Sequence, residues 1–301
     1  MKKYFSLAIL LLFFSIACDN VSDIQPENSS DGEIASFPPE YIPPMMPYDE
    51  VGILHNQTCD VIYQILKAEK LAGNLNDDSD VLTCARNSGI DYLDENLNLN
   101  WGGITTDEYN SMFNFITTNV FDETKLWTPS VDPDLTTTQK SILNQLNFII
   151  DNGTDLATIV SDITALEIYA ASICNDDEIV VIMSGLSVAR HSLTYWHNNL
   201  TKWQQLPYLQ KVDRGTGGAK ILDINWKRAA KADIAGAIAG GCGGAVAGAI
   251  SGAVAGAAAG GIGAVPGAVA GAMSGAAAGA ISGAIAGTVG SIMMDLLDDW
   301  W

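Results

Sequence analysis

The chain has 301 residues, with 15 basic and 35 acidic side chains and a formal net charge of −20. The acidic excess is concentrated in residues 18–218, which contain nine basic and 30 acidic residues. A surface of that charge stays soluble and repels nucleic acid and anionic lipid headgroups, so we expect no nucleic-acid partner.

The first 17 residues are typical of a secretory signal peptide. Lys2 and Lys3 precede an apolar run that is too short to cross a bilayer as a helix of about 20 residues. The run ends in Ser15-Ile16-Ala17-Cys18, which resembles the lipobox of bacterial lipoproteins. The resemblance implies cleavage before Cys18 and acylation of that residue, for example by palmitate. The alternative is an ordinary signal peptide followed by a chance cysteine.

Residues 18–50 are expected to be a lipidated tether. Six of the ten prolines of the chain fall in this stretch, which favours an extended and semi-stiff spacer without a core. Together with the preceding signal, the tether predicts an exported protein anchored in the bacterial cell envelope, on the outer membrane or the cell surface.

Residues 51–213 are expected to form an acidic domain made of helices. Apolar residues recur at helical spacing, and no alternating strand pattern is persuasive. The predicted helices are 53–72, 79–87, 106–120, 138–151, 154–171 and 176–196. The fold class predicted for the whole chain is therefore all-α, a helical bundle followed by a helical hairpin.

Four cysteines remain after Cys18, and none of them forms a CxxC pair. In an oxidising compartment, Cys59 and Cys84 are the candidate disulfide, because they lie on two neighbouring predicted helices. The alternative is that all four cysteines are small buried hydrophobic residues.

No arrangement of residues predicts a catalytic, metal or cofactor site. His191 and His197 are six residues apart, which places them on different helix faces rather than at the spacing of metal ligands. We therefore interpret these two and His55 as polar surface residues. The aromatic cluster of Tyr195, Trp196, His197, Trp203 and Tyr208 is either a partner-binding face or packing between helices. We expect no enzyme activity.

Residues 233–301 have the most distinctive pattern, and they follow a linker, 214–232, with five basic residues. No charged residue occurs between Asp233 and Asp295, and the only proline of this part is Pro266. A glycine stands at every fourth position in two series, Gly236, Gly240, Gly244, Gly248, Gly252, Gly256 and Gly260, then Gly267, Gly271, Gly275, Gly279, Gly283 and Gly287. The pattern predicts two helices joined by a turn before Pro266, a proline position that suits the start of a helix.

A membrane is the environment in which such helices are expected. Each glycine costs a helix in water about 1 kcal/mol relative to alanine. In lipid an unsatisfied backbone group costs more, and glycines four apart allow two helix backbones to pack closely. Trp226, Trp300 and Trp301 flank the helices and are the expected interface anchors. The alternatives are a soluble hairpin packed on the helical domain and a self-associating bundle or pore.

The lipobox cysteine together with the segment Gly236–Gly287 resembles the glycine-zipper lipoproteins of Gram-negative envelopes. That resemblance implies a structural component of the outer membrane, although this chain has a domain of about 200 residues between anchor and zipper. We therefore predict a non-catalytic envelope lipoprotein that binds membrane lipid and forms homo-oligomers through the zipper. The zipper is also similar to those of bacteriocins and contact-dependent toxins, so the alternative is a membrane-permeabilising antibacterial toxin.

Overall fold

The computed structural model describes seven stretches of the chain, all of which belong to one compact unit, Glu40–Trp301. These stretches are residues 48–75, 78–97, 135–206, 210–212, 219–221, 226–258 and 264–297. Several predictions fall outside them, namely the signal peptide, Cys18, the tether up to residue 47, the helix 106–120, Trp300 and Trp301.

The described residues have the all-α fold that the sequence predicts. Their seven helices are α2 (Asp49–Leu71), α3 (Asp78–Leu97), α5 (Thr137–Asn152), α6 (Leu156–Ile173), α7 (Asp176–Gln204), α8 (Trp226–Ala258) and α9 (Ala264–Leu297). One small feature was not predicted: β1 (Gln210–Val212) pairs antiparallel with β2 (Ala219–Ile221). Strands of three residues are too short to show an alternating pattern in the sequence.

Several helices extend beyond the predicted limits, and α7, for example, continues eight residues past Trp196. The prediction ends helix α3 at Asn87, whereas the structure continues it for ten more residues, through Gly89. A Cβ atom at Gly89 would lie 3.0 Å from Cγ2 of Ile285, so α3 passes close to α9 at this glycine. Helix α8 begins at Trp226 rather than Asp233, so the end of the predicted linker is helical.

Side-chain caps define the starts of α5, α6 and α7. Thr136 and Gln139 form a capping box before α5, and the Asp155 carboxylate accepts a hydrogen bond of 2.9 Å from the Thr158 amide. At α7, the Glu178 amide donates to Asn175 Oδ1 and the Asn175 amide donates back to the Glu178 carboxylate. Such reciprocal bonds satisfy amides that a helix start leaves without partners.

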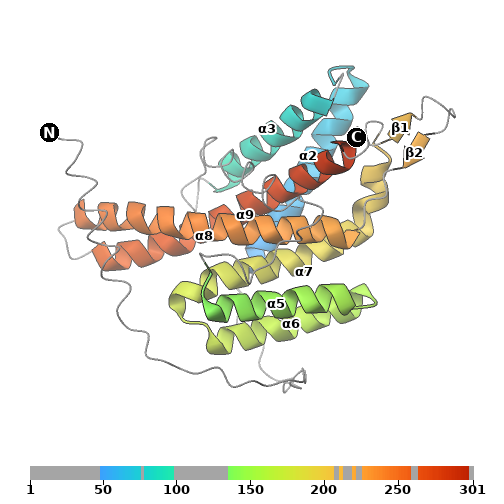
Figure 1. Ribbon diagram of the computed structural model, residues 1–301. Coiled ribbons are helices and arrows are strands. Elements are labelled where there is room, and N and C mark those ends of the chain that lie inside the picture. The colour runs from blue at the N-terminus through green and yellow to red at the C-terminus, as the bar shows by residue number, and fades with distance from the viewer. Residues whose placement is uncertain are drawn as a thin grey trace. The chain divides into compact units, whose positions relative to one another are not determined.

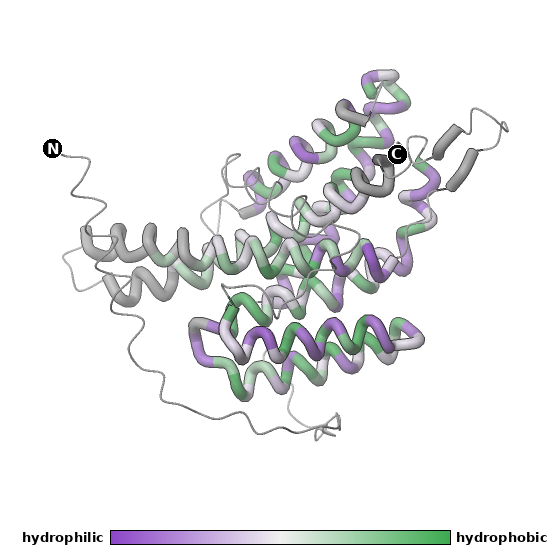
Figure 2. The backbone as a smooth tube through the Cα atoms, in the orientation of Figure 1, coloured by the Kyte–Doolittle hydropathy of each residue, from purple (hydrophilic) through white to green (hydrophobic). Residues whose placement is uncertain are grey.

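The hairpin of α8 and α9 lies among the other helices (Figure 1). Helices α8 and α9 contact each other along their length, α7 packs along α8, and α2 contacts α7 and α9. Helix α3 lies against α2 and α9, while α5 and α6 pack against α7. Along α5, hydrophilic and hydrophobic residues alternate with the helical turn, as a helix with one face on the core requires (Figure 2).

The buried apolar side chains form one continuous core that includes both the helical domain and the hairpin. Leu66 of α2, Leu193 of α7, Ile238 of α8 and Ile285 of α9 all belong to it. The helical region 51–213 and the hairpin 233–301 share this core. The part of the hairpin near its two ends is a central element of the helical bundle.

Candidate functional site

The two helices of the hairpin touch at the glycines. A Cβ atom placed on Gly279 would lie 2.1 Å from the carbonyl oxygen of Gly240, and one on Gly283 would lie 2.0 Å from that of Gly236. A Cβ atom on Gly244 would lie 2.0 Å from the carbonyl oxygen of Gly275. Real Cβ atoms do not approach so closely, so these positions admit only glycine while the helices keep this spacing.

For the other described glycines of the two series, the structure gives the helix in which each lies but no contact with a glycine of the partner helix. Gly248, Gly252 and Gly256 lie in α8, Gly267 and Gly271 lie in α9, and Gly260 is outside the described residues. Gly287 meets α8 at a non-glycine position, because its added Cβ would lie 2.3 Å from the carbonyl oxygen of Ala232. The spacing of four residues therefore identified the contact between α8 and α9 but not each partner.

The hairpin has a buried base and a more open far part. Every residue of α9 from Ala276 to Ser291 is buried, and α8 is mostly buried from Ala229 to Gly241. Toward the turn the surroundings open, because a Cβ atom on Gly243 would meet no atom within 4 Å and Met273 is 41% exposed. The far end of the hairpin extends past the other helices (Figure 1).

The base contains a completely buried polar cluster centred on Asp233 of α8. Its Oδ2 atom accepts hydrogen bonds of 2.6 Å from Ser192 Oγ and from Trp196 Nε1, both on α7. Its Oδ1 atom accepts one of 2.6 Å from Thr288 Oγ1 on α9. His55 of α2 completes the cluster, with Nε2 at 3.3 Å from Asp233 Oδ2. One carboxylate therefore joins four helices.

The neighbours of His55 favour its charged form. Burial alone lowers the pKa of its imidazole, but attraction to Cys59 and Asp233 and hydrogen bonds with both outweigh that effect. The pKa of His55 is consequently raised well above its ordinary value. A buried ion pair of this kind is tolerated when the remaining hydrogen-bonding capacity is also satisfied, as Ser192 and Trp196 do for the carboxylate.

The cluster brings together a thiol, an imidazole and a carboxylate, but not in the geometry of a catalytic triad. Cys59 Sγ lies 3.6 Å from His55 Nε2, the same nitrogen that faces Asp233. In a triad the carboxylate orients the nitrogen opposite to the one that activates the nucleophile. Here the opposite nitrogen, Nδ1, faces Asn56 Oδ1 at 3.0 Å. Both Cys59 and His55 have 0% exposure, so a substrate has no access to the thiol.

A second polar cluster lies beside the first, where α2 crosses α7. His191 Nε2 is 2.8 Å from Asp49 Oδ1, and Arg190 forms ion pairs with Asp49 and, at 3.2 Å, with Glu167. Burial raises the pKa of Asp49, but hydrogen bonds from His191 and Arg190 outweigh it and leave the pKa below its usual value. Gly52 permits the close crossing, because a Cβ atom there would lie 2.5 Å from the His191 ring.

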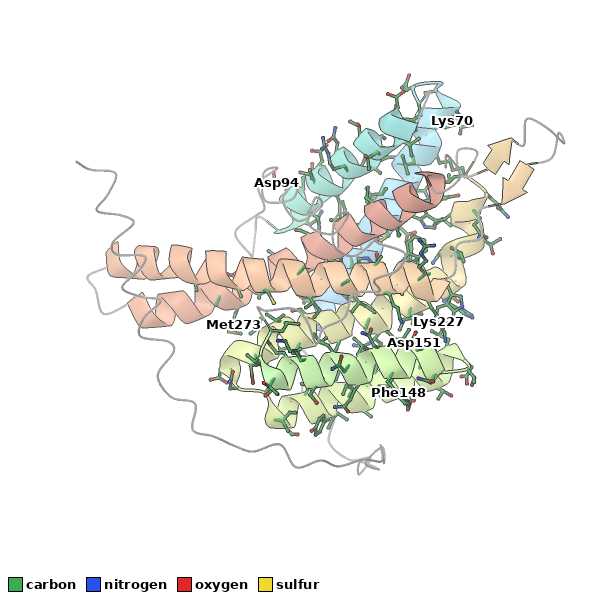
Figure 3. All side chains as sticks on the ribbon, in the orientation of Figure 1. Lys70, Asp94, Phe148, Asp151, Lys227 and Met273 are labelled. Atoms are coloured by element: carbon green, nitrogen blue, oxygen red, sulfur yellow. The ribbon has the colours of Figure 1, made fainter. Side chains whose placement is uncertain are left out.

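The start of α8 is attached to α5 by basic side chains. Lys227 Nζ donates hydrogen bonds of 2.8 Å to the carbonyl oxygens of Ile150 and Gly153, at the end of α5. Lys231 pairs with Asp151, one turn further along α8 (Figure 3 labels Lys227 and Asp151). Lys227 donates to carbonyl oxygens that the end of α5 leaves without partners, and Lys231 pairs with a surface acid. The basic linker therefore has a structural role here.

Trp226, which the sequence predicts to be an interface anchor, contacts two neighbouring side chains. Its ring lies 5.3 Å from the His197 ring in an edge-to-face contact and 5.7 Å from Lys227 Nζ. Of the aromatic cluster near the end of α7, Tyr195, Trp196 and Trp203 are buried, so these residues pack between helices rather than form a binding face.

The candidate disulfide is not formed in the structure. Cys59 and Cys84 are both free thiols, and Cys59 instead contacts His55 and Thr288. Neighbouring helices allow many thiol positions, and the inward orientation of Cys59 toward α9 could not be read from the sequence. The interpretation of His55 as a surface residue was wrong for the same reason, since it is completely buried.

Sequence reasoning missed the buried cluster itself. Asp233 was interpreted only as the border of the uncharged segment, although a single acid opening an apolar helix is also the pattern of a buried, paired carboxylate. Within the described residues, no group of three His, Cys, Asp or Glu side chains is placed to hold a metal ion.

Comparison with known proteins identifies no relative of this chain. No protein-family model, no curated protein and no solved structure matches it.

Proposed function

We propose that the protein is a non-catalytic lipoprotein of the bacterial envelope, anchored through Cys18, that embeds its glycine-zipper hairpin in a membrane and self-associates there. One observation carries the proposal. A segment without any charged residue, from Ile234 to Met294, folds as two helices whose backbones touch at glycines. Such a hairpin satisfies its own backbone hydrogen bonds, which is the condition for entering lipid.

The dimensions of the hairpin support this role. Among the described residues, two helical segments are long and apolar enough to cross a membrane, Leu156–Ile173 and Gly271–Ser291. The second belongs to the hairpin. From Gly243 to its end at Ala258, α8 is about 24 Å long at 1.5 Å per residue. The hydrocarbon layer is about 30 Å thick, so a full crossing also requires part of the buried base.

Self-association is supported by the exposed surface of α8 at one glycine, Gly243. Gly244 faces α9 within the hairpin, whereas the neighbouring Gly243 is exposed, with open space where a side chain would stand. A helix of another copy can approach the backbone closely at such a position. The partner proposed for this surface is a second hairpin of the same chain.

One observation favours the second candidate, a membrane-permeabilising antibacterial protein. The helical bundle encloses the base of the hairpin, including all of α9 from Ala276 to Ser291. A chain that must stay soluble before it reaches a foreign membrane needs this protection, and a permanently resident component does not. The two candidates share the inserted hairpin and differ in whether insertion makes the bilayer leak.

The test is flotation with liposomes, combined with dye release, for the mature chain carrying Cys18→Ala. Deleting the hairpin is not a clean control, because its base is part of the core. Gly243→Lys is better, because the side chain enters open space in the folded protein but places a charge near the middle of α8. A lysine there opposes insertion by about 3 kcal/mol. Gly243→Ala is the matched control.

We expect the parent chain and Gly243→Ala to float and Gly243→Lys to stay in the soluble fraction. Flotation without dye release supports the envelope role, whereas dye release that Gly243→Lys abolishes supports the permeabilising role. If the parent chain does not float, or if Gly243→Lys floats equally well, hairpin insertion is ruled out.

A further inference from the structure

The polar cluster at the base of the hairpin exists only while the hairpin is inside the bundle. Asp233 is supplied by α8 and Thr288 by α9, whereas its other partners, His55, Ser192 and Trp196, belong to α2 and α7. All five residues are buried. Separation of the hairpin from α2 and α7 therefore breaks the ion pair and two hydrogen bonds of 2.6 Å at one carboxylate.

The position of Asp233 in the chain gives this cluster a specific consequence. It is the last charged residue before the uncharged segment, so in an inserted hairpin it lies at the membrane surface, in contact with water. An ionised carboxylate is well solvated there and needs none of its bundle partners. Inside the bundle the same carboxylate depends on all of them, because an unpaired buried charge is strongly destabilising.

The cluster is also the only polar link between the hairpin and α2 that the described residues show at this depth. Around it, α7 and α8 meet through apolar contacts such as Gly185 with Ile238, where an added Cβ would lie 2.2 Å from Ile238 Cδ1. Apolar contacts are lost gradually and are replaced by lipid, whereas the ion pair is present or absent. That difference makes the ion pair suited to hold one of two states.

We propose that the His55–Asp233 pair is an autoinhibitory lock, which retains the base of the α8–α9 hairpin in the bundle until it is broken and the hairpin inserts. The lock rests on the proposed function, because it regulates the insertion of that same hairpin. Lys227 keeps the start of α8 attached to α5, so release separates the base from α2 and α7 without detaching α8 from the domain.

The test uses the mature chain with Cys18→Ala and three further variants. Asp233→Asn removes the charge with little change of shape, and His55→Gln breaks the same pair from α2. Ser282→Ala is the matched control, because Ser282 is buried on α9 but bonds only to the Ala278 carbonyl oxygen of its own helix. Amide hydrogen exchange is measured in solution, and flotation is measured with liposomes.

Both lock variants are expected to exchange amides of 229–241 and 276–291 at least about tenfold faster, while α5 and α6 exchange as in the parent. Both should also float more completely than the parent, and Ser282→Ala should match the parent. An equal acceleration in α5 and α6 means general destabilisation and overturns the lock. Unchanged exchange in both variants overturns it as well.

The outcomes separate the lock from the function on which it rests. Faster exchange of the hairpin without flotation of any variant supports the lock and contradicts membrane insertion. If the parent floats, and if both variants exchange amides and float as the parent does, the result supports insertion and contradicts the lock. The double variant Asp233→Asn/His55→Gln should add little to either single change, because both remove one interaction.

Discussion

Thr288 Oγ1 donates a hydrogen bond of 2.6 Å to Asp233 Oδ1, and this bond closes the hairpin at the end opposite its turn. The two residues are 55 positions apart and both are completely buried. Together with the glycine contacts, the bond fixes the register of α9 against α8.

Thr288→Val should therefore destabilise the protein by about 1.5–3 kcal/mol, the range for a buried hydrogen bond to a charged group. Ser282→Ala removes a hydroxyl of similar burial whose bond stays within α9, so its cost should be below about 1 kcal/mol. Urea unfolding of both variants measures the difference. Equal costs would show that the Thr288 bond contributes nothing specific.

The glycine contact predicts opposite effects for two changes to alanine. Gly279→Ala should destabilise the folded protein by about 2 kcal/mol, because its Cβ would stand 2.1 Å from the Gly240 carbonyl oxygen and force the helices apart. Gly243→Ala meets no atom and should stabilise α8 by about 0.5–1 kcal/mol through helix propensity. Thermal unfolding checks both values, and stabilisation by Gly279→Ala would contradict the close packing.

The raised pKa of His55 predicts a stability that depends on pH. Its pKa is higher in the folded protein than in the unfolded chain, so the unfolded chain loses the proton first as pH rises. The contribution of His55 is thus complete below about pH 6.5 and is lost as pH rises through the folded pKa.

The measurement is the free energy of unfolding from pH 6 to 10 for the parent and for His55→Gln. The difference between the two should shrink toward high pH. Three groups face His55, namely Cys59 from the same helix, Asp233 from α8 and Thr288 from α9. Cys59→Ala serves as the control for the contribution of the thiol. A difference that is constant over the range would mean that His55 is neutral in the folded protein.

The free thiols of the structure predict a simple chemical count. After unfolding without reductant, the mature chain with Cys18→Ala should react with four equivalents of an alkylating reagent, at Cys59, Cys84, Cys174 and Cys242. A disulfide between Cys59 and Cys84 would lower the count to two. In the native protein Cys174 should react slowly, since burial, with a smaller effect of Glu178, raises the pKa of its thiol to about 11.

The sequence predicted the helices and the hairpin because both leave a local signal. Apolar spacing identified α5 and α6 within about two residues at each end, and the glycine series identified the face on which α8 meets α9. The position of Pro266 near the start of α9 follows from its fixed backbone geometry.

The cluster around Asp233 could not be predicted in the same way. His55, Ser192 and Thr288 are separated from Asp233 by 178, 41 and 55 residues, and only the packing of four helices brings them together. The sequence therefore left open whether the hairpin packs on the helical domain, and the structure places its base in the core. The sequence holds two local signs of the cluster, the single acid Asp233 before the uncharged segment and the spacing of His55 and Cys59, one helical turn apart.

The most direct test of membrane embedding places a small environment-sensitive fluorophore on Gly243→Cys, in the mature chain carrying Cys18→Ala. Cys84, Cys174 and Cys242 are changed to alanine, and the completely buried Cys59 is retained. With liposomes, the account predicts a blue-shifted emission that quenchers attached near the bilayer centre suppress. Emission that stays water-like and responds only to quenchers in solution would show that the hairpin remains outside the membrane.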